Sequence, residues 1–104
     1  MTVDDKNIEE YIKTFGQAEA VCGSVSSAAD LITDVCNVQS REKVTNADRL
    51  NLAGSMANVV IAICMLKEVY GINDECLQAF IDGRQRADKM RTSYKKGGGN
   101  GNTV

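Results

Sequence analysis

The sequence predicts an all-α fold, a bundle of about four helices in which two long central helices pack within an oligomer. Pro is absent from all 104 residues, which removes the strongest helix breaker. Aromatic residues make up only 5% of the chain and Trp is absent, so the core has to be built from Ala, Val, Ile, Leu and Met. Apolar residues recur at three- and four-residue spacing instead of alternating, which is typical of helices.

The length allows one domain, predicted over residues 1–96. A Gly- and Asn-rich tail, residues 97–104, has nothing to bury and is predicted to be disordered. The first predicted helix runs from Asp4 to Phe15 and breaks at Gly16. The second follows, and a polar segment over residues 37–43 ends it. Its apolar side at helical spacing consists of Ala18, Val21, Cys22, Val25, Ala28, Ala29, Ile32, Val35 and Cys36.

A third helix is predicted to begin near Asn46, where Thr45 and Asp48 resemble a capping box. Its second half, around Val59 to Leu66, is apolar almost all round and must be covered on every face. Four short helices can scarcely do this, so an obligate homo-oligomer, a dimer or a tetramer, is predicted. Gly71 suits the end of this helix, and Asn73 suits the start of a fourth that runs from Asp74 towards Tyr94. The residues expected to face inward on the fourth helix are Leu77, Phe80, Ile81, Ala87 and Met90.

Composition argues against several classes of partner. A net charge of −2 and a pI near 5.0 are too acidic for a protein that neutralises nucleic-acid phosphates. The chain opens on a polar, acidic stretch, and its longest uninterrupted apolar run is far shorter than a membrane span, so no membrane partner and a cytoplasmic location are expected. Four scattered Cys with no His indicate reduced, core-filling thiols, and neither a metal nor another cofactor is expected.

The order of these segments resembles the MazG-like, all-α nucleoside triphosphate pyrophosphohydrolases over roughly residues 8–92. In that family an F/W-G-x-x-x-Q segment precedes an E-E-x-x-E-L motif on one helix. The next helix carries E-E-x-A-D-V, an apolar run and a K-x-x-Y-G-I-like ending. This chain keeps the frame as FG at residues 15–16, ADL at residues 29–31 and MANVVI at residues 56–61 before LKEVYGI.

The family's carboxylates lie three or four residues apart on two facing helices, where they hold divalent cations against a triphosphate. The resemblance places Ser26 and Ser27 where the first motif has Glu-Glu, and it retains the third acid as Asp30. In the second motif Gly54, Ser55 and Asn58 stand where Glu, Glu and Asp are expected. Magnesium needs anionic oxygen ligands, so the resemblance implies a pseudoenzyme that does not hydrolyse its ligand.

Hydroxyl and amide groups in place of carboxylates can hydrogen-bond a nucleotide without metal. The resemblance therefore implies a nucleotide-binding protein whose ligand is a nucleotide-derived small molecule. Proteins of this size and type are often encoded by phages, which implies an anti-defence sponge that sequesters a nucleotide immune signal in the host cytoplasm. The predicted ligand-binding residues are Ser26, Ser27, Asp30, Ser55 and Asn58, with Arg84, Arg86 and Lys89 available for the phosphate.

Two alternatives remain open. The first is an active pyrophosphohydrolase with a relocated metal site that recruits Asp30, Asp34, Asp48 or Glu68. The second is a structural or partner-binding helical oligomer, in which residues such as Ser26 and Gly54 are simply small side chains that let the helices approach closely.

Overall fold

The computed structural model describes residues 1–98 and confirms that the chain is all-α. Within those residues it forms four α-helices, one π-helical turn and no strand. They are α1 (Asp5–Phe15), α2 (Gln17–Gln39), α3 (Asn46–Tyr70), α4 (Asp74–Ser93) and η1 (Tyr94–Gly98). The chain divides into two units, Met1–Gly71 and Ile72–Val104, and each is described by itself below.

The ends of the helices follow from local sequence. Asp4 accepts hydrogen bonds from the backbone N–H groups of Lys6 at 3.0 Å and Asn7 at 3.3 Å, which caps α1. Gly16, at φ 91°, separates α1 from α2 in a conformation that other residues rarely adopt. Asn73 caps α4 by accepting from the N–H of Cys76 at 2.8 Å. These predicted positions are confirmed, but Asn37 to Gln39, expected in the polar segment, extend α2 instead.

Both ends of α3 carry the predicted signals. The Thr45 hydroxyl accepts from the N–H of Asp48 at 3.1 Å, and the Asp48 carboxylate accepts from the N–H of Thr45 at 2.9 Å, so the capping box is complete. Arg41, in the loop before α3, donates to the same carboxylate. At the other end Gly71 takes a left-handed conformation at φ 65°.

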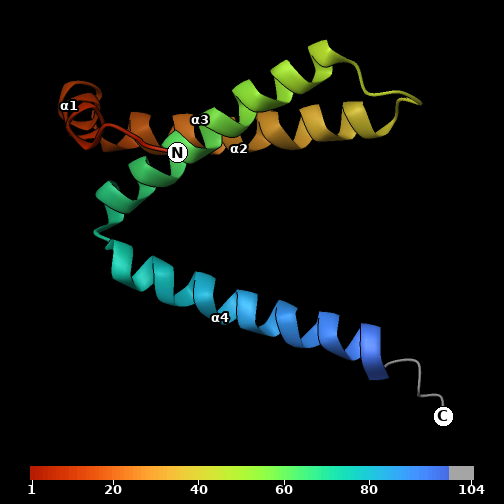
Figure 1. Ribbon diagram of the computed structural model, residues 1–104. Helices are drawn as coiled ribbons and strands as arrows, with labels where there is room; N and C mark the ends of the chain where they lie inside the picture. The colour runs from red at the N-terminus through yellow and green to blue at the C-terminus, as the bar shows by residue number, and fades with distance from the viewer. Residues whose placement is uncertain (99–104) are drawn as a thin grey trace. The chain divides into compact units, whose positions relative to one another are not determined.

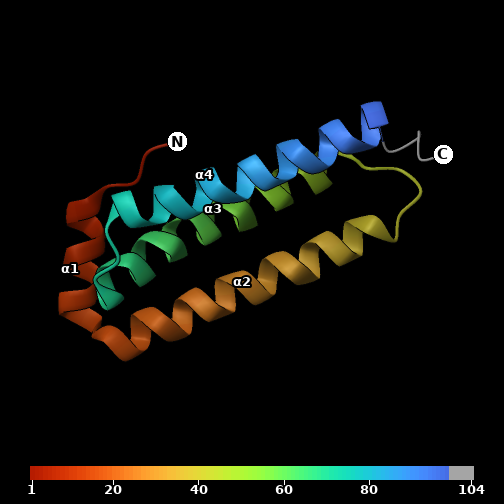
Figure 2. The same cartoon turned by 90° about the horizontal axis from the view of Figure 1, so that it is seen from below.

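Helices α2 and α3 form an antiparallel hairpin, and α1 lies across one end of it (Figures 1 and 2). The register is marked by the Ser24 hydroxyl, which lies 3.4 Å from the carbonyl oxygen of Ala62 on α3. It is marked again further along by the Ser55 hydroxyl, which donates to Asp34 on α2. Along α2 and α3 a line of buried and half-buried residues repeats at alternating four- and three-residue spacing, and we call this line the seam. The seam comprises Ala20, Ser24, Ser27, Leu31, Asp34 and Val38 on α2 and Asp48, Leu52, Ser55, Val59, Ala62, Leu66 and Val69 on α3.

The apolar side predicted for the second helix is not the side that packs against α3. Val25 is 62% exposed and Ile32 is 65% exposed, whereas the polar Ser24 is 5% exposed. The Ser24 hydroxyl is satisfied by the carbonyl oxygen of Ala20 at 2.7 Å, so its burial leaves no unpaired polar atom. Apolar periodicity located the helix correctly but did not identify the face that is covered within the chain.

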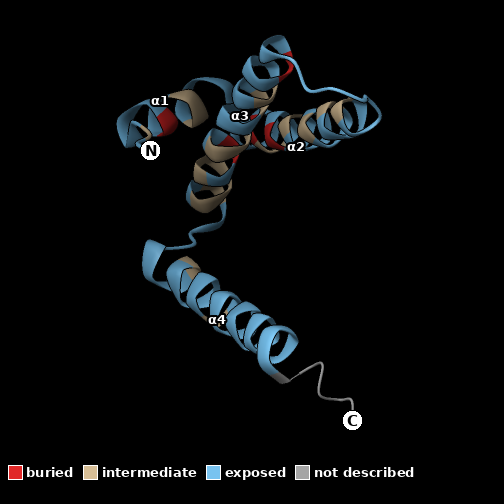
Figure 3. Ribbon diagram, turned by 45° about the vertical axis from the view of Figure 1, so that its right-hand side comes forward, coloured by how far each residue is buried: buried red, intermediate tan, exposed pale blue. Residues whose placement is uncertain are grey.

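The core of the first unit is small. Its buried apolar side chains are Ile8, Ala20 and Ala62, one from each of α1, α2 and α3. Figure 3 shows the few buried positions in red on α1, α2 and α3, among residues that are half-buried or exposed.

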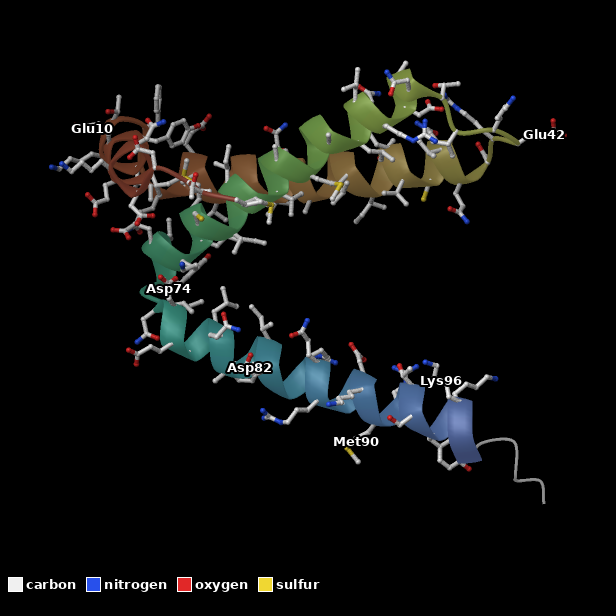
Figure 4. The ribbon with its side chains drawn as sticks, viewed as in Figure 1. Glu10, Glu42, Asp74, Asp82, Met90 and Lys96 are labelled. Carbon is white, nitrogen blue, oxygen red and sulfur yellow. The ribbon has the colours of Figure 1, made fainter. Side chains whose placement is uncertain are left out.

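In the second unit no residue of α4 is buried, contrary to the inward side predicted for it. Phe80 is 75% exposed and Met90 is 73% exposed, and Figure 4 shows the Met90 side chain pointing away from the helix.

The prediction of core-filling thiols is also wrong for three of the four free cysteines, since Cys22, Cys36 and Cys76 are exposed. Of the predicted tail, Gly97 and Gly98 belong to η1, and the remainder lies outside the described residues.

By length and composition alone, α3 could cross a membrane. Its most apolar stretch has a mean hydropathy of 1.6, and 11% of that stretch is buried. The sequence prediction considered only the uninterrupted run of apolar residues, which is much shorter than the helix. Core helices of soluble proteins can show the same composition, but they are normally mostly buried.

Asp48→Asn is expected to lower the stability of the protein at neutral pH by an amount that disappears in acid. The N–H of Thr45 is the main cause of the lowered pKa of the Asp48 carboxyl; burial opposes it, while the Thr45 hydroxyl and the Arg41 charge add to it. A carboxyl group whose pKa is lowered on folding stabilises the folded protein at pH values above its ordinary pKa of 3.8. This stabilisation is lost as the pH falls through the pKa of the group in the folded protein. Urea unfolding at pH 7 and pH 3 checks this, and an equal effect of the substitution at both values would contradict it.

Candidate functional site

The two open sides of the α2–α3 hairpin differ in chemistry. Successive residues of an α-helix are rotated by about 100° around the helix axis. The position of a residue relative to the seam therefore tells on which of the two open sides of the hairpin it lies. A groove lined by Gly23 and Ser27 from α2 and by Asn58 and Ile61 from α3 shows which sides of the two helices coincide. We call this side the polar face. Its residues are Gly23, Ser26, Ser27, Asp30 and Asp34 on α2 and Asn51, Gly54, Ser55, Asn58 and Ile61 on α3.

The groove lies at the end of the polar face where α1 crosses the hairpin. Its volume is about 200 Å³, and Tyr11 of α1 and Met65 of α3 complete its apolar wall. Ser27 is half-buried there, and its hydroxyl donates to the carbonyl oxygen of Gly23 at 3.0 Å. Asn58 is exposed at the rim, so its amide is accessible from solvent. The groove thus combines an aromatic ring, a thioether and two polar groups.

A second hollow of about 370 Å³ adjoins the groove between the N-terminal segment, α1 and α3. It shares three lining residues with the groove: Tyr11, Ile61 and Met65. The Tyr11 ring is held by Phe15 one turn later on α1, with ring centroids 4.7 Å apart and planes inclined by 41°. Either hollow alone is near or below the lower limit of small-molecule sites, about 300 Å³, and the two hollows adjoin at these three shared side chains.

The five candidate residues of the first unit fall on the polar face, but only Ser27 and Asn58 line the groove. Ser26 and Asp30 are exposed on α2. Ser55 is half-buried, and its hydroxyl donates to Asp34. Among the described residues no buried side-chain nitrogen or oxygen is without a hydrogen-bond partner, so none of these groups requires a ligand in order to be satisfied.

Close helix approach does not explain the glycine at position 54. A Cβ atom built on Gly54 would meet nothing within 4 Å, and the same is true of Gly23. The position that a carboxylate occupies in the MazG-like motif is therefore open, with room for a longer side chain. The close contact between the helices lies elsewhere, at Ala20 and Ala62, which are 2% and 6% exposed.

The four acids named for a relocated metal site do not lie together. Asp48 is at the first turn of α3 and Glu68 at its last, and twenty residues of helix span about 30 Å. The carboxylate of Asp48 is already engaged by Thr45 and Arg41. Within residues 1–98 no three side chains of the types His, Cys, Asp and Glu gather closely enough to hold a metal ion. Of the four acids proposed for the relocated metal site, only Asp30 and Asp34 lie close together, one turn apart on α2.

The basic residues Arg84, Arg86 and Lys89 lie on α4, in the second unit, and all three are exposed. Arg86 and Lys89 are three residues apart and share one side of the helix. Arg84 lies two residues from Arg86, on nearly the opposite side. One phosphate can therefore meet Arg86 together with Lys89, but not all three groups.

Sequence reasoning missed Tyr11, Gly23, Ile61 and Met65 as groove residues. From the sequence, Tyr11 and Met65 look like ordinary core residues. Apolar residues recur at the same helical spacing whether they pack against other side chains or line a hollow. The signal that could have revealed the groove is the pairing of α2 with α3, which no periodicity within one helix contains.

Comparison of the chain with protein-family models, with curated proteins and with solved structures finds no match.

Proposed function

We propose that this chain is a non-hydrolysing nucleotide-binding protein with a MazG-like helical arrangement, acting as a cytoplasmic homo-oligomer, a dimer or a tetramer. The observation that carries the proposal is the polar face. Ser26, Ser27, Asp30, Ser55 and Asn58 come from two helices, yet they lie on one side of the hairpin beside an aromatic groove. Hydroxyl, amide and carboxylate groups beside an aromatic wall are the groups that recognise ribose and a base.

The base is placed against Tyr11 and Met65, where the two hollows share a wall. The ribose then follows the polar face, with Ser27 and Asn58 as its nearest polar partners. Asp30 and Asp34 would repel phosphate, so Asp30 is assigned to sugar hydroxyls or a base amino group. The sequence prediction gives the phosphate to basic residues of the second unit, of which Arg86 and Lys89 share one side of α4.

The chemistry of the donor set supports binding without hydrolysis. Two carboxylates remain on the polar face, and Asp34 accepts a hydrogen bond from Ser55. Magnesium is held by carboxylates and phosphates in near-octahedral geometry, and a single accessible Asp is a poor anchor for it. A phage protein of this kind would serve as a sponge that removes a nucleotide immune signal from the host cytoplasm.

The test is calorimetric titration in EDTA with nucleoside triphosphates, cyclic dinucleotides and ADP-ribose derivatives, alongside an assay for pyrophosphate release with magnesium. At least one ligand is expected to bind without metal, and no pyrophosphate release is expected. Arg86→Ala should weaken binding about tenfold, the value of one charge-assisted hydrogen bond, while Arg84→Ala provides the matched control on the other side of α4.

Three results would overturn the proposal. A ligand that binds only with added magnesium would contradict the assignment of a metal-free site. Turnover that disappears in Asp30→Ala and Asp34→Ala would instead establish the active enzyme. Binding of none of these nucleotides would favour the structural or partner-binding oligomer.

A further inference from the structure

One side of α4 carries a stripe of apolar and small side chains. Their spacing alternates between four and three residues, which is the spacing of helices that pack against another helix. No residue of α4 is buried, and Figure 3 shows the helix as exposed along almost its whole length. Leu77 and Ile81 widen the apolar side near the start of the helix. The stripe, which we call the α4 stripe, consists of Cys76, Phe80, Gly83, Ala87, Met90 and Tyr94.

The sequence in the middle of α4 is chemically the same in both directions. Residues 82–88 are Asp-Gly-Arg-Gln-Arg-Ala-Asp, so small and charged residues are mirrored about Gln85. The mirror extends over the whole α4 stripe, with small residues at its centre and larger ones at both ends. A two-fold axis makes residue i of one copy contact residue j of the other, and j contact i, so such a helix is complementary to a second copy that runs in the opposite direction. The mirrored pairs of the stripe are Gly83 with Ala87, Phe80 with Met90 and Cys76 with Tyr94.

The charges along α4 and η1 favour the same antiparallel arrangement. Residues 74–83 include three acidic residues and no basic one, whereas residues 84–96 include six basic residues and one acidic residue. In an antiparallel pair the acidic half of each helix lies beside the basic half of the other, which brings Glu75 opposite the partner's Lys95. A parallel pair would place the two basic halves together. Because charges beside a helix–helix contact set the orientation of the partners, an antiparallel copy is selected.

The charges beside the centre of the α4 stripe are balanced as well. Arg84 and Asp88 lie one turn apart on one edge of the stripe, and Asp82 and Arg86 lie one turn apart on the other edge. Around a two-fold axis each edge meets the same edge of the partner, so each Arg comes near an Asp of the other copy. An anionic lipid surface or a nucleic acid fits this arrangement less well, because Asp82 and Asp88 would face its phosphates.

Gly83 has no evident role within its own chain. Gly lowers the stability of a helix relative to Ala when it lies in the interior. Among the described residues, a Cβ atom at this position would meet only a terminal nitrogen of Arg86, at 3.7 Å, which is an ordinary contact. The distance between the axes of packed helices depends on the side chains at the contact, so Gly83 facing the partner's Ala87 allows a close approach. A second helix at this point accounts for the glycine.

We propose that the α4 stripe is a contact surface between two copies of the chain, packed antiparallel about a two-fold axis at the level of Gln85. Phe80 of each copy then contacts Met90 of the other, a favourable pairing of sulfur with an aromatic ring. The proposal rests on the homo-oligomer of the proposed function and assigns a surface to it. It is tested without nucleotide, so its failure is distinguishable from a failure of nucleotide binding in calorimetry.

The test is a disulfide bond that the antiparallel pair alone brings into reach. Tyr94 lies opposite the partner's Cys76, so Tyr94→Cys places two thiols face to face. Helix axes about 8 to 10 Å apart bring facing Cα atoms to roughly 5 Å, which suits a disulfide. Within one chain the two positions are about 27 Å apart along the helix, so this bond forms only between chains.

The full-length Tyr94→Cys protein is incubated with oxidised glutathione, and the linked peptides are identified by mass spectrometry. Most chains are expected to become dimers joined through Cys76 and position 94. The matched control is Thr92→Cys, because Thr92 is exposed on nearly the opposite side of the helix. Its link to Cys76 is expected to be at least tenfold less abundant.

A second substitution separates helix packing from helix stability. Leu favours a helix more than Gly, so circular dichroism of Gly83→Leu should show at least as much helix as the parent protein. The Leu side chain keeps the two helices apart, so in the Tyr94→Cys protein the link to Cys76 should fall at least tenfold. The control is Gln85→Leu, on the side of α4 away from the stripe, which should change the link less than twofold.

Four results would overturn the proposal. Links between two copies of Cys76 would indicate a parallel pair. Equal linking in Tyr94→Cys and Thr92→Cys would indicate random collision. The absence of any dimer linked through α4 would show that another surface covers the stripe. A Gly83→Leu protein that links as well as its parent would exclude a close approach at the centre of the stripe.

Discussion

Ile63→Asp is expected to leave no folded protein at micromolar concentration. Ile63 is 44% exposed in the single chain, where an Asp would retain most of its hydration and cost little. In the proposed oligomer a partner covers this part of α3, and an unpaired carboxylate buried there costs several kcal/mol. A small domain has a total stability of only about 5 to 15 kcal/mol, so a cost of that size is enough to unfold it. Circular dichroism and sedimentation of the purified variant measure the loss of helix and of assembly together.

Two other substitutions by Asp serve as controls for this result. Ala62→Asp should unfold the protein whatever the oligomeric state, because Ala62 is 6% exposed within its own chain. Leu50→Asp should be tolerated, because Leu50 is 69% exposed and an acidic residue near the start of α3 interacts favourably with the helix dipole. An Ile63→Asp variant that is monomeric and yet as helical as Leu50→Asp would show that folding does not require the partner.

Asn58→Leu is expected to reduce nucleotide affinity by a factor of ten to a hundred in EDTA. The substitution removes an amide that can both donate and accept, and it places a branched apolar side chain at the rim of the 200 Å³ groove. Loss of one or two hydrogen bonds to a bound ligand corresponds to about 1 to 3 kcal/mol, which is a factor of this size. Calorimetry with the tightest ligand of the wild-type protein measures the change.

Asn51→Leu is the matched control for this substitution. Asn51 lies two turns earlier on the same face of α3, is exposed and does not line the groove. Its substitution should change affinity less than threefold. Equal losses in the two variants would move the ligand away from the α1 end of the hairpin, and no loss in either would remove it from the polar face.

Local signals predicted the helices well because their physics is local. The capping box of Thr45 and Asp48, the left-handed Gly71 and the Asn73 cap each involve groups within four residues of one another. The prediction failed by a few residues at Gln39, where the C-cap Ser40 keeps a right-handed backbone and no glycine marks the end of the helix, so α2 continues into polar sequence. The all-α class follows from the same local regularities.

Which side of a helix is covered could not be predicted in this way. The apolar stripe of α2 contains Val25 and Ile32, whereas its seam contains Ser24 and Asp34. Polar residues are tolerated in that seam because each finds a partner there: Ser24 the carbonyl oxygens of Ala20 and Ala62, and Asp34 the hydroxyl of Ser55. The contacts of Ser24 with Ala62 and of Ser55 with Asp34 join residues 38 and 21 positions apart, which periodicity within one helix does not report.

By itself, the sequence determined the four helices, most of their ends and the apolar composition of α3. These properties depend on composition and on neighbours in the chain, so they can be read without a fold. Only the tertiary structure decided that α2 and α3 pair with Ser24 opposite Ala62, which separates a polar face from an apolar one. It also decided that Tyr11 closes a groove beside Ser27 and Asn58. The reason is that a groove is formed by residues from three helices, and their meeting is set by the packing of whole helices.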